Sequence, residues 1–231
     1  MGIPLQADFE ERSSAVGLAS RVVRDETGKV TGRLNGGMPM VIDALERFPE
    51  VTAERQADAI RASLSYLNSI GLTAVYDPAG MGIKRESYAR IRALAADAEL
   101  TVRIFHTLSR GVVPSTPEEA RGLVEEIRAS RPFQGDDSVD QIAIGESYYA
   151  PFHRDSLFTP TNPTAEDIAA ARSILTAAAK GGWSAQTHAS RPETIDTLLD
   201  VITEINENYP LRQLRWSITH ADLIGREQVE R

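Results

Sequence analysis

Two histidines near the C-terminal end of the sequence are the residues best suited to do chemistry. His188 lies in the run SAQTHA at 184–189, and His220 lies in the run WSITHA at 216–221. Each stands where a short apolar stretch stops and a helical pattern begins. Because neighbouring parallel strands end at the same edge of a sheet, the two imidazoles are expected to converge on one site. A divalent metal is the ligand that such a pair commonly binds.

A third metal ligand is offered by Glu146, which follows the apolar run VDQIAI at 139–144. Adjacent strands lie about 4.8 Å apart, so side chains at their ends can share one ion. A catalytic metal site usually has three protein ligands and one open position. Histidine and carboxylate ligands suit zinc, with iron or manganese as alternatives. The competing interpretation makes Glu146 a helix cap or a surface carboxylate.

Four further side chains are candidates for the walls of such a site. His106 ends the strand pattern TVRIFH at 101–106, and Tyr148 and His153 follow Glu146 in a proline-bounded loop. We expect these three as substrate contacts, although packing in the core or in a loop is the alternative for each. Asp77 precedes Pro78 and either shapes a turn or binds the metal. No serine lies in a G-x-S-x-G context, which argues against a serine hydrolase triad.

The elements that must position these residues alternate strictly along the chain. Strand patterns occupy 72–76, 101–106, 139–144, 183–188 and 214–219, and helical patterns occupy 53–70, 84–98, 117–130, 164–180 and 193–208. Such alternation indicates a parallel sheet with right-handed crossovers. No glycine-rich phosphate-binding turn follows any strand, which argues against a nucleotide-binding doubly wound sheet. We predict an α/β fold, a partial (β/α)8 TIM-type barrel of about five strands over residues 52–231, with an open sheet as the alternative.

The first 51 residues differ from the rest. The runs at 19–25 and 29–34 are separated by a short turn sequence containing Gly28, which predicts a β-hairpin. A short helix is expected near 41–47. We interpret residues 1–51 as an N-terminal hairpin appendage that packs on the sheet.

Composition excludes several classes of protein. The net charge of −8 over 231 residues supplies no basic face for nucleic acid. The absence of cysteine excludes disulfides, thiolate zinc sites and cysteine nucleophiles. No apolar run approaches the ~18 residues that a membrane span requires, and the N-terminus lacks a signal-peptide layout. A soluble, cytoplasmic protein is therefore expected. As a separate expectation, its substrate is a small molecule.

Several of these runs together resemble the amidohydrolase superfamily, in the branch that includes N-substituted formamide deformylases. The run GLTAVYD at 71–77 is similar to that branch's G-[IL]-T-[ST]-V-x-D strand, RWSITHA at 215–221 to its R-x-x-I-x-H-A strand, and residues 22–32 to its hairpin. The resemblance implies a (β/α)8 barrel whose one or two divalent metals activate water to attack an amide-type carbon. It also implies that His188 and His220 are the fifth- and sixth-strand ligands.

The sequence departs from that family in three ways. It contains no H-x-H pair, it has no lysine between Lys84 and Lys180 to act as a carboxylated ligand, and it offers no eighth-strand aspartate. Glu146 is then the acidic replacement for the lysine. We interpret the chain as a central segment of a metal-dependent amidohydrolase that cleaves C–N bonds other than peptide bonds and that is inactive alone, with doubtful metal occupancy.

Two other interpretations stay open. One is a non-catalytic binding or regulatory module on a degenerate barrel, and the other is an unrelated open α/β sheet with structural histidines. In each case the sheet has unpaired edges, which favour a homodimer.

Overall fold

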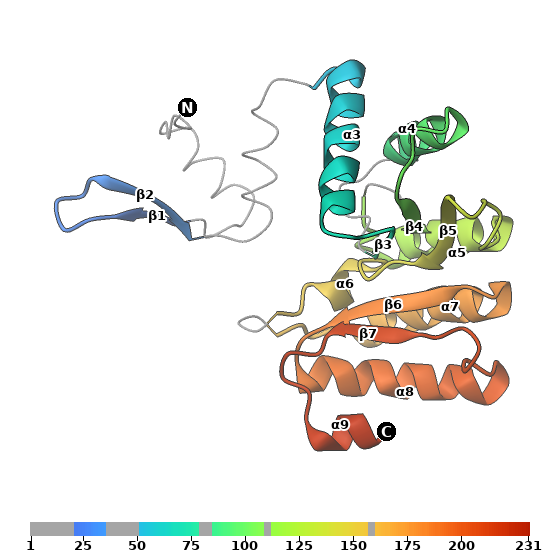
Figure 1. Cartoon of the computed structure of the whole chain (residues 1–231). Coiled ribbons are helices and arrows are strands. Elements are labelled where there is room, and N and C mark those ends of the chain that lie inside the picture. Colours follow the sequence, from blue (N-terminus) through green and yellow to red (C-terminus); the bar gives the residue numbers. More distant parts are fainter. Residues whose placement is uncertain (1–20, 36–50, 79–84, 109–111, 157–159) are drawn as a thin grey trace. The chain divides into compact units, whose positions relative to one another are not determined.

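The computed structural model describes residues 21–35, 51–78, 85–108, 112–156 and 160–231. The chain divides into two compact units, Met1–Gln56 and Ala57–Arg231. In the first, β1 (Arg21–Arg24) and β2 (Val30–Asn35) pair antiparallel (Figure 1). The Asp25 carboxylate accepts hydrogen bonds from the backbone N–H groups of Thr27 and Lys29 in the connecting turn. The hairpin is thereby confirmed, its packing on the sheet stays a prediction, and the helix expected at 41–47 lies outside the described residues.

The second unit contains one sheet of five strands in chain order. These are β3 (Ala74–Asp77), β4 (Arg103–Leu108), β5 (Val139–Ile144), β6 (Ser184–Ala189) and β7 (Ser217–His220). Every neighbouring pair is parallel. The sheet curls into a half-barrel with helices on its outer face (Figure 1). The partial TIM-type barrel predicted from the alternation is therefore confirmed.

The connecting helices follow their sequence signals. They are α3 (Ala53–Ser69), α4 (Arg85–Ala96), α5 (Pro117–Ala129), α7 (Ala165–Gly181) and α8 (Pro192–Asn208), with the short helices α6 (Ala150–His153) and α9 (Arg226–Glu230). Thr116 and Glu119 form a reciprocal capping box that starts α5, and Thr164 and Asp167 do the same for α7. Gly182 ends α7 at φ 76°, a conformation that glycine adopts without steric cost.

The larger core cluster joins the helices α5, α7 and α8 to the strands β5 and β6. Its largest fully buried side chains include Trp183, Ile174, Leu175, Ile195 and Leu198. This rigid layer supports the strands from whose ends Glu146 and His188 project. None of the helices in the described ranges combines the length and apolar character needed to cross a bilayer.

Candidate metal centre

Three side chains meet at the C-terminal edge of the sheet. Glu146 follows β5, His188 lies near the end of β6, and His220 ends β7. One ligand atom from each lies within 4.8 Å of the other two. The Glu146 Oε2 atom is 3.3 Å from His220 Nε2 and 3.9 Å from His188 Nδ1. The structure thus brings together the three residues that the sequence singled out, and their role as ligands stays a prediction.

Backbone hydrogen bonds hold Glu146 between two strands. Its N–H donates to the Pro78 carbonyl at 2.9 Å, just after β3, and its carbonyl accepts from the His188 N–H at 3.4 Å. The preceding Gly145 has no room for a side chain, because a Cβ there would lie 2.3 Å from the same Pro78 oxygen. The Asp77-Pro78 turn therefore helps to place the Glu146 carboxylate.

His220 has an unusual backbone conformation. Its φ is 70° and that of Ala221 is 50°, a region that costs a residue with a Cβ about 1–3 kcal/mol and that is common at functional sites. The Ala221 N–H donates to the carbonyls of Ala189 at 2.8 Å and Thr219 at 3.0 Å, and the Leu223 N–H donates to Ser190 at 2.9 Å. These bonds tie the segment after β7 to the segment after β6, and so fix the two histidines relative to each other.

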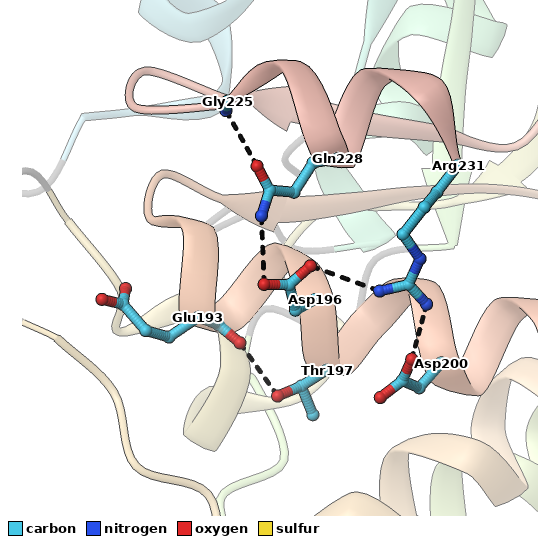
Figure 2. A network of polar contacts seen from close by, with 7 residues as sticks. All are labelled: Glu193, Asp196, Thr197, Asp200, Gly225, Gln228 and Arg231. Atoms are coloured by element: carbon cyan, nitrogen blue, oxygen red, sulfur yellow. Dashed lines mark hydrogen bonds and ion pairs between the residues drawn. The ribbon is translucent and has the colours of Figure 1, made fainter.

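A polar network on α8 holds the same segment further along (Figure 2). The Gln228 side chain accepts from the Gly225 N–H at 3.0 Å and donates to the Asp196 carboxylate at 3.0 Å. Arg231 donates to Asp196 at 3.2 Å and to Asp200. Exposed ion pairs of this kind stabilise weakly, by about 0–1 kcal/mol each. The network orients α9 on α8 and contributes little to stability.

The tautomer of His188 follows from its second ring nitrogen. Nε2 lies 2.7 Å from the backbone carbonyl oxygen of Asp155. A carbonyl can only accept, so Nε2 carries the proton and Nδ1 turns its lone pair toward Glu146. That is the arrangement a metal ligand requires.

The pKa of His188 reflects the same neighbours. Burial by itself would lower this pKa, but the Glu146 carboxylate and the Asp155 carbonyl hold it above its ordinary value. Without a cation between them, the Nδ1 lone pair and the carboxylate oxygen would face each other as two acceptors. A proton or a metal resolves that conflict.

His106 lies elsewhere, on the helix-covered face of the sheet. It is 2% exposed, Ile104 on the same face of the strand is also buried, and the His106 ring stacks on Tyr88 of α4 at a centroid distance of 3.7 Å. Nε2 accepts from Arg92 at 3.2 Å and Nδ1–H donates to the Thr107 carbonyl at 2.9 Å. His106 is therefore a neutral, hydrogen-bonded packing residue, and its proposed contact with substrate finds no support in this position.

Stability is expected to fall in acid because of His106. Burial lowers the pKa of His106, and this effect exceeds that of the Thr107 carbonyl, which raises the pKa; the positive charge of Arg92 lowers the pKa further. The unfolded chain then binds more protons than the folded one once the pH falls below about 6.5. Urea denaturation measures the free energy of unfolding of the wild type and of His106→Gln. The wild-type value minus the variant value should therefore be smaller at pH 5.5 than at pH 7.5. A difference that stays flat over this range would contradict the assignment. His188 is present in both proteins and cancels.

The remaining candidates occupy different surroundings. Tyr148 is 5% exposed in the core, with its hydroxyl 3.4 Å from that of Thr187, and burial raises its pKa. Its contact with substrate stays a prediction that this burial does not favour. His153 is the last residue of α6, and its side chain lies outside the described part of the structure. The Asp77 carboxylate accepts from the Tyr88 hydroxyl at 2.6 Å and is not among the three clustered ligands.

Asp155 was not singled out from the sequence. It is 1% exposed, and its Oδ2 accepts from the backbone N–H groups of Ser190 at 2.7 Å and Arg191 at 2.8 Å, at the start of α8. A signal existed: α8 has Pro192 in its first turn but an arginine at the N-cap, which cannot accept a hydrogen bond. A helix start of this kind requires an acceptor from elsewhere in the chain.

Comparisons with known proteins bear on the family and the fold of the chain. The sequence model of the amidohydrolase family matches residues 3–231. An uncharacterized metal-dependent hydrolase from Pyrococcus horikoshii OT3 is similar in structure, with a TM-score of 0.52 and 18% identity over 96% of this chain and 43% of its own. A second, from Pyrococcus furiosus, has a TM-score of 0.52 and 16% identity over 95% of this chain and 44% of its own. The chain thus spans less than half the length of either. No curated protein matches it.

Proposed function

The chain belongs to the amidohydrolase family, and from that premise we propose that it contributes a metal centre to the hydrolysis of a small molecule at a C–N bond other than a peptide bond. The observation that carries the proposal is the convergence of Glu146, His188 and His220, whose ligand atoms lie within 4.8 Å of one another. Their donor chemistry, two imidazoles and one carboxylate, suits zinc first and iron or manganese as alternatives.

The orientation of the ligands supports a metal over a purely structural cluster. His188 has its Nε2 proton committed to the Asp155 carbonyl, which leaves Nδ1 free of a proton for coordination. His220 presents Nε2 toward Glu146 at 3.3 Å. Structural histidines would instead be expected to satisfy their nitrogens separately, as His106 does with Arg92 and Thr107.

The chemistry of such a centre is the activation of water. A divalent metal lowers the pKa of bound water from about 15.7 to about 7, which makes hydroxide available at neutral pH. Within this chain, Glu146 supplies the negative charge that offsets the cation, and the two histidines fix its position. The His220 side chain is 40% exposed, so the centre is open to solvent and to a small substrate on that side.

Catalytic power is expected to be low in these residues by themselves. The sequence has no H-x-H pair, and metal-dependent hydrolases of this family are expected to use one. We therefore propose that the chain binds a metal yet hydrolyses small amides no faster than a His188→Ala variant. Robust zinc-dependent turnover by the chain would contradict the proposed inactivity.

The direct test of the metal centre is a calorimetric titration of the metal-free chain with zinc. We expect one equivalent to bind to the wild type and a His106→Gln protein to bind as well, because His106 lies on the opposite face of β4 from the barrel interior. No binding by the wild type would leave Glu146, His188 and His220 as a structural cluster.

Association of two copies is also proposed. Among the described residues, β3 and β7 each pair on one side only. Tyr66 on α3, Ile70 just after that helix and Tyr76 on β3 are 65%, 56% and 41% exposed. Exposed edges and apolar side chains favour self-association. Sedimentation velocity should show a dimer that Ile70→Glu weakens, whereas a monomer at high concentration would contradict it. A soluble, cytoplasmic location stays a prediction.

A further inference from the structure

We propose that Asp155 is a positioning residue for the metal centre, which holds His188 in the tautomer that leaves Nδ1, the nitrogen facing Glu146, able to coordinate a cation. The inference rests on the proposed metal function and adds a residue to it. Asp155 acts through two groups at once: its carboxylate binds the start of α8, and its backbone carbonyl accepts the Nε2 proton of His188.

The first step is the anchoring of Asp155 itself. It lies two residues beyond α6, in the loop that follows β5. Its Oδ2 atom accepts from Ser190 N–H at 2.7 Å and from Arg191 N–H at 2.8 Å. Charge-assisted bonds of this length are about twice as strong as neutral ones, and the partial positive charge of a helix N-terminus favours the carboxylate further. The position of Asp155 is therefore tied to α8.

The second step is the effect of that anchor on His188. Ser190 and Arg191 come after His188 and Ala189 in the chain, so the Asp155 carboxylate binds the same segment that carries the histidine. The Asp155 carbonyl is thereby held 2.7 Å from Nε2. Two separate contacts of Asp155 hold the loop after β5 against the end of β6: its carboxylate accepts from the backbone N–H groups after His188, and its carbonyl accepts from the His188 ring. Together they fix the ring orientation that aims Nδ1 at Glu146.

The third step is the cost of the arrangement. Asp155 is 1% exposed, and its second oxygen, Oδ1, is buried with no hydrogen-bond partner among the described residues. A buried carboxylate with an unpaired oxygen is expensive. An asparagine would keep one acceptor oxygen for the two N–H groups and would remove the buried charge. The fold alone therefore does not require the carboxylate, while the acceptor geometry is required.

The experiment compares three proteins by NMR and by zinc titration. Long-range nitrogen–proton correlations report the tautomer of each of the four histidines in the metal-free chain, at a pH where His188 is neutral. We expect Nε2–H at His188 in the wild type and in Asp155→Asn, with zinc affinities within about threefold of each other. In Asp155→Ala we expect a mixture of tautomers and a zinc affinity about 10–100-fold weaker, the usual effect of losing a residue that orients a ligand.

Each outcome supports or overturns the proposal. Nδ1–H at His188 in the wild type would overturn it, and so would a folded Asp155→Ala protein with unchanged tautomer and zinc affinity, which would leave Asp155 as a helix anchor only. If Asp155→Ala does not fold, the other two proteins still decide, because a mixed tautomer in Asp155→Asn contradicts positioning by the acceptor oxygen. Failure of the wild type to bind zinc would instead refute the metal function, which the tautomer measurement does not depend on.

Discussion

Glu146→Gln is expected to weaken zinc binding by more than about 100-fold. The substitution keeps the shape of the side chain but removes the charge that faces His188 Nδ1 at 3.9 Å and His220 Nε2 at 3.3 Å. Losing a residue that merely orients a metal ligand costs about 10–100-fold in affinity, so loss of a charged ligand should cost more. Calorimetric titration of the metal-free proteins with zinc measures the change.

The matched control for this loss of charge is Glu118→Gln. Glu118 lies on α5, its side chain is 86% exposed, and its ion pair with Arg121 at 3.3 Å is a surface contact. The control should bind zinc like the wild type, with the same free energy of unfolding to within about 0.5 kcal/mol. Wild-type zinc affinity in Glu146→Gln would show that the carboxylate is not a ligand.

Gly145→Ala is expected to destabilise the fold by about 3 kcal/mol, at the upper end of what one extra methyl group costs in a packed interior. The new Cβ would lie 2.3 Å from the Pro78 carbonyl oxygen, 2.6 Å from Thr107 Oγ1 and 2.9 Å from Thr107 Cβ. The Pro78 oxygen cannot withdraw without breaking its bond to the Glu146 N–H. Urea denaturation should show the loss of stability, and zinc titration should show weaker binding because Glu146 is displaced.

Gly225→Ala provides a matched control for the added methyl group. Its Cβ would meet the end of the flexible Gln228 side chain, at 2.7 Å, and that side chain can move. We expect a loss below about 1 kcal/mol, typical of a changed helix N-cap, and unchanged zinc affinity. Equal effects from the two glycine substitutions would mean that the close approach of β3, β4 and β5 around Gly145 is not rigid.

The sequence by itself determined the alternation of strands and helices, and with it the parallel half-barrel. Hydrophobic periodicity and capping residues such as Thr116 and Thr164 are local signals, so they predict helices and strands without knowledge of the rest of the chain. The placement of Glu146, His188 and His220 followed for the same reason. Once the strands are parallel, residues at their C-terminal ends must share an edge.

Only the tertiary structure decided which of the remaining candidates join that edge. His106 stands near the end of a strand like the others, but its side chain shares a face with Ile104 and packs on α4. Successive side chains of a strand point to opposite faces of the sheet. A shift of one residue along the strand therefore moves a side chain from the barrel interior to the face that the helices cover. A sequence pattern of six residues does not fix that register, particularly where the pairing of β4 with β5 shifts between His106 and Thr107.

The residues that hold the site in place could not be predicted from local sequence patterns either. Asp155 reaches 35 residues along the chain to the start of α8. Gly145 must be small because Pro78, which follows β3, two places away from β5 in the sheet, lies against it. Such contacts depend on how loops close after the sheet has formed, which no short-range pattern records. The proposed metal ligands can therefore be predicted from the strand ends, whereas the groups that orient them depend on the packing of distant segments.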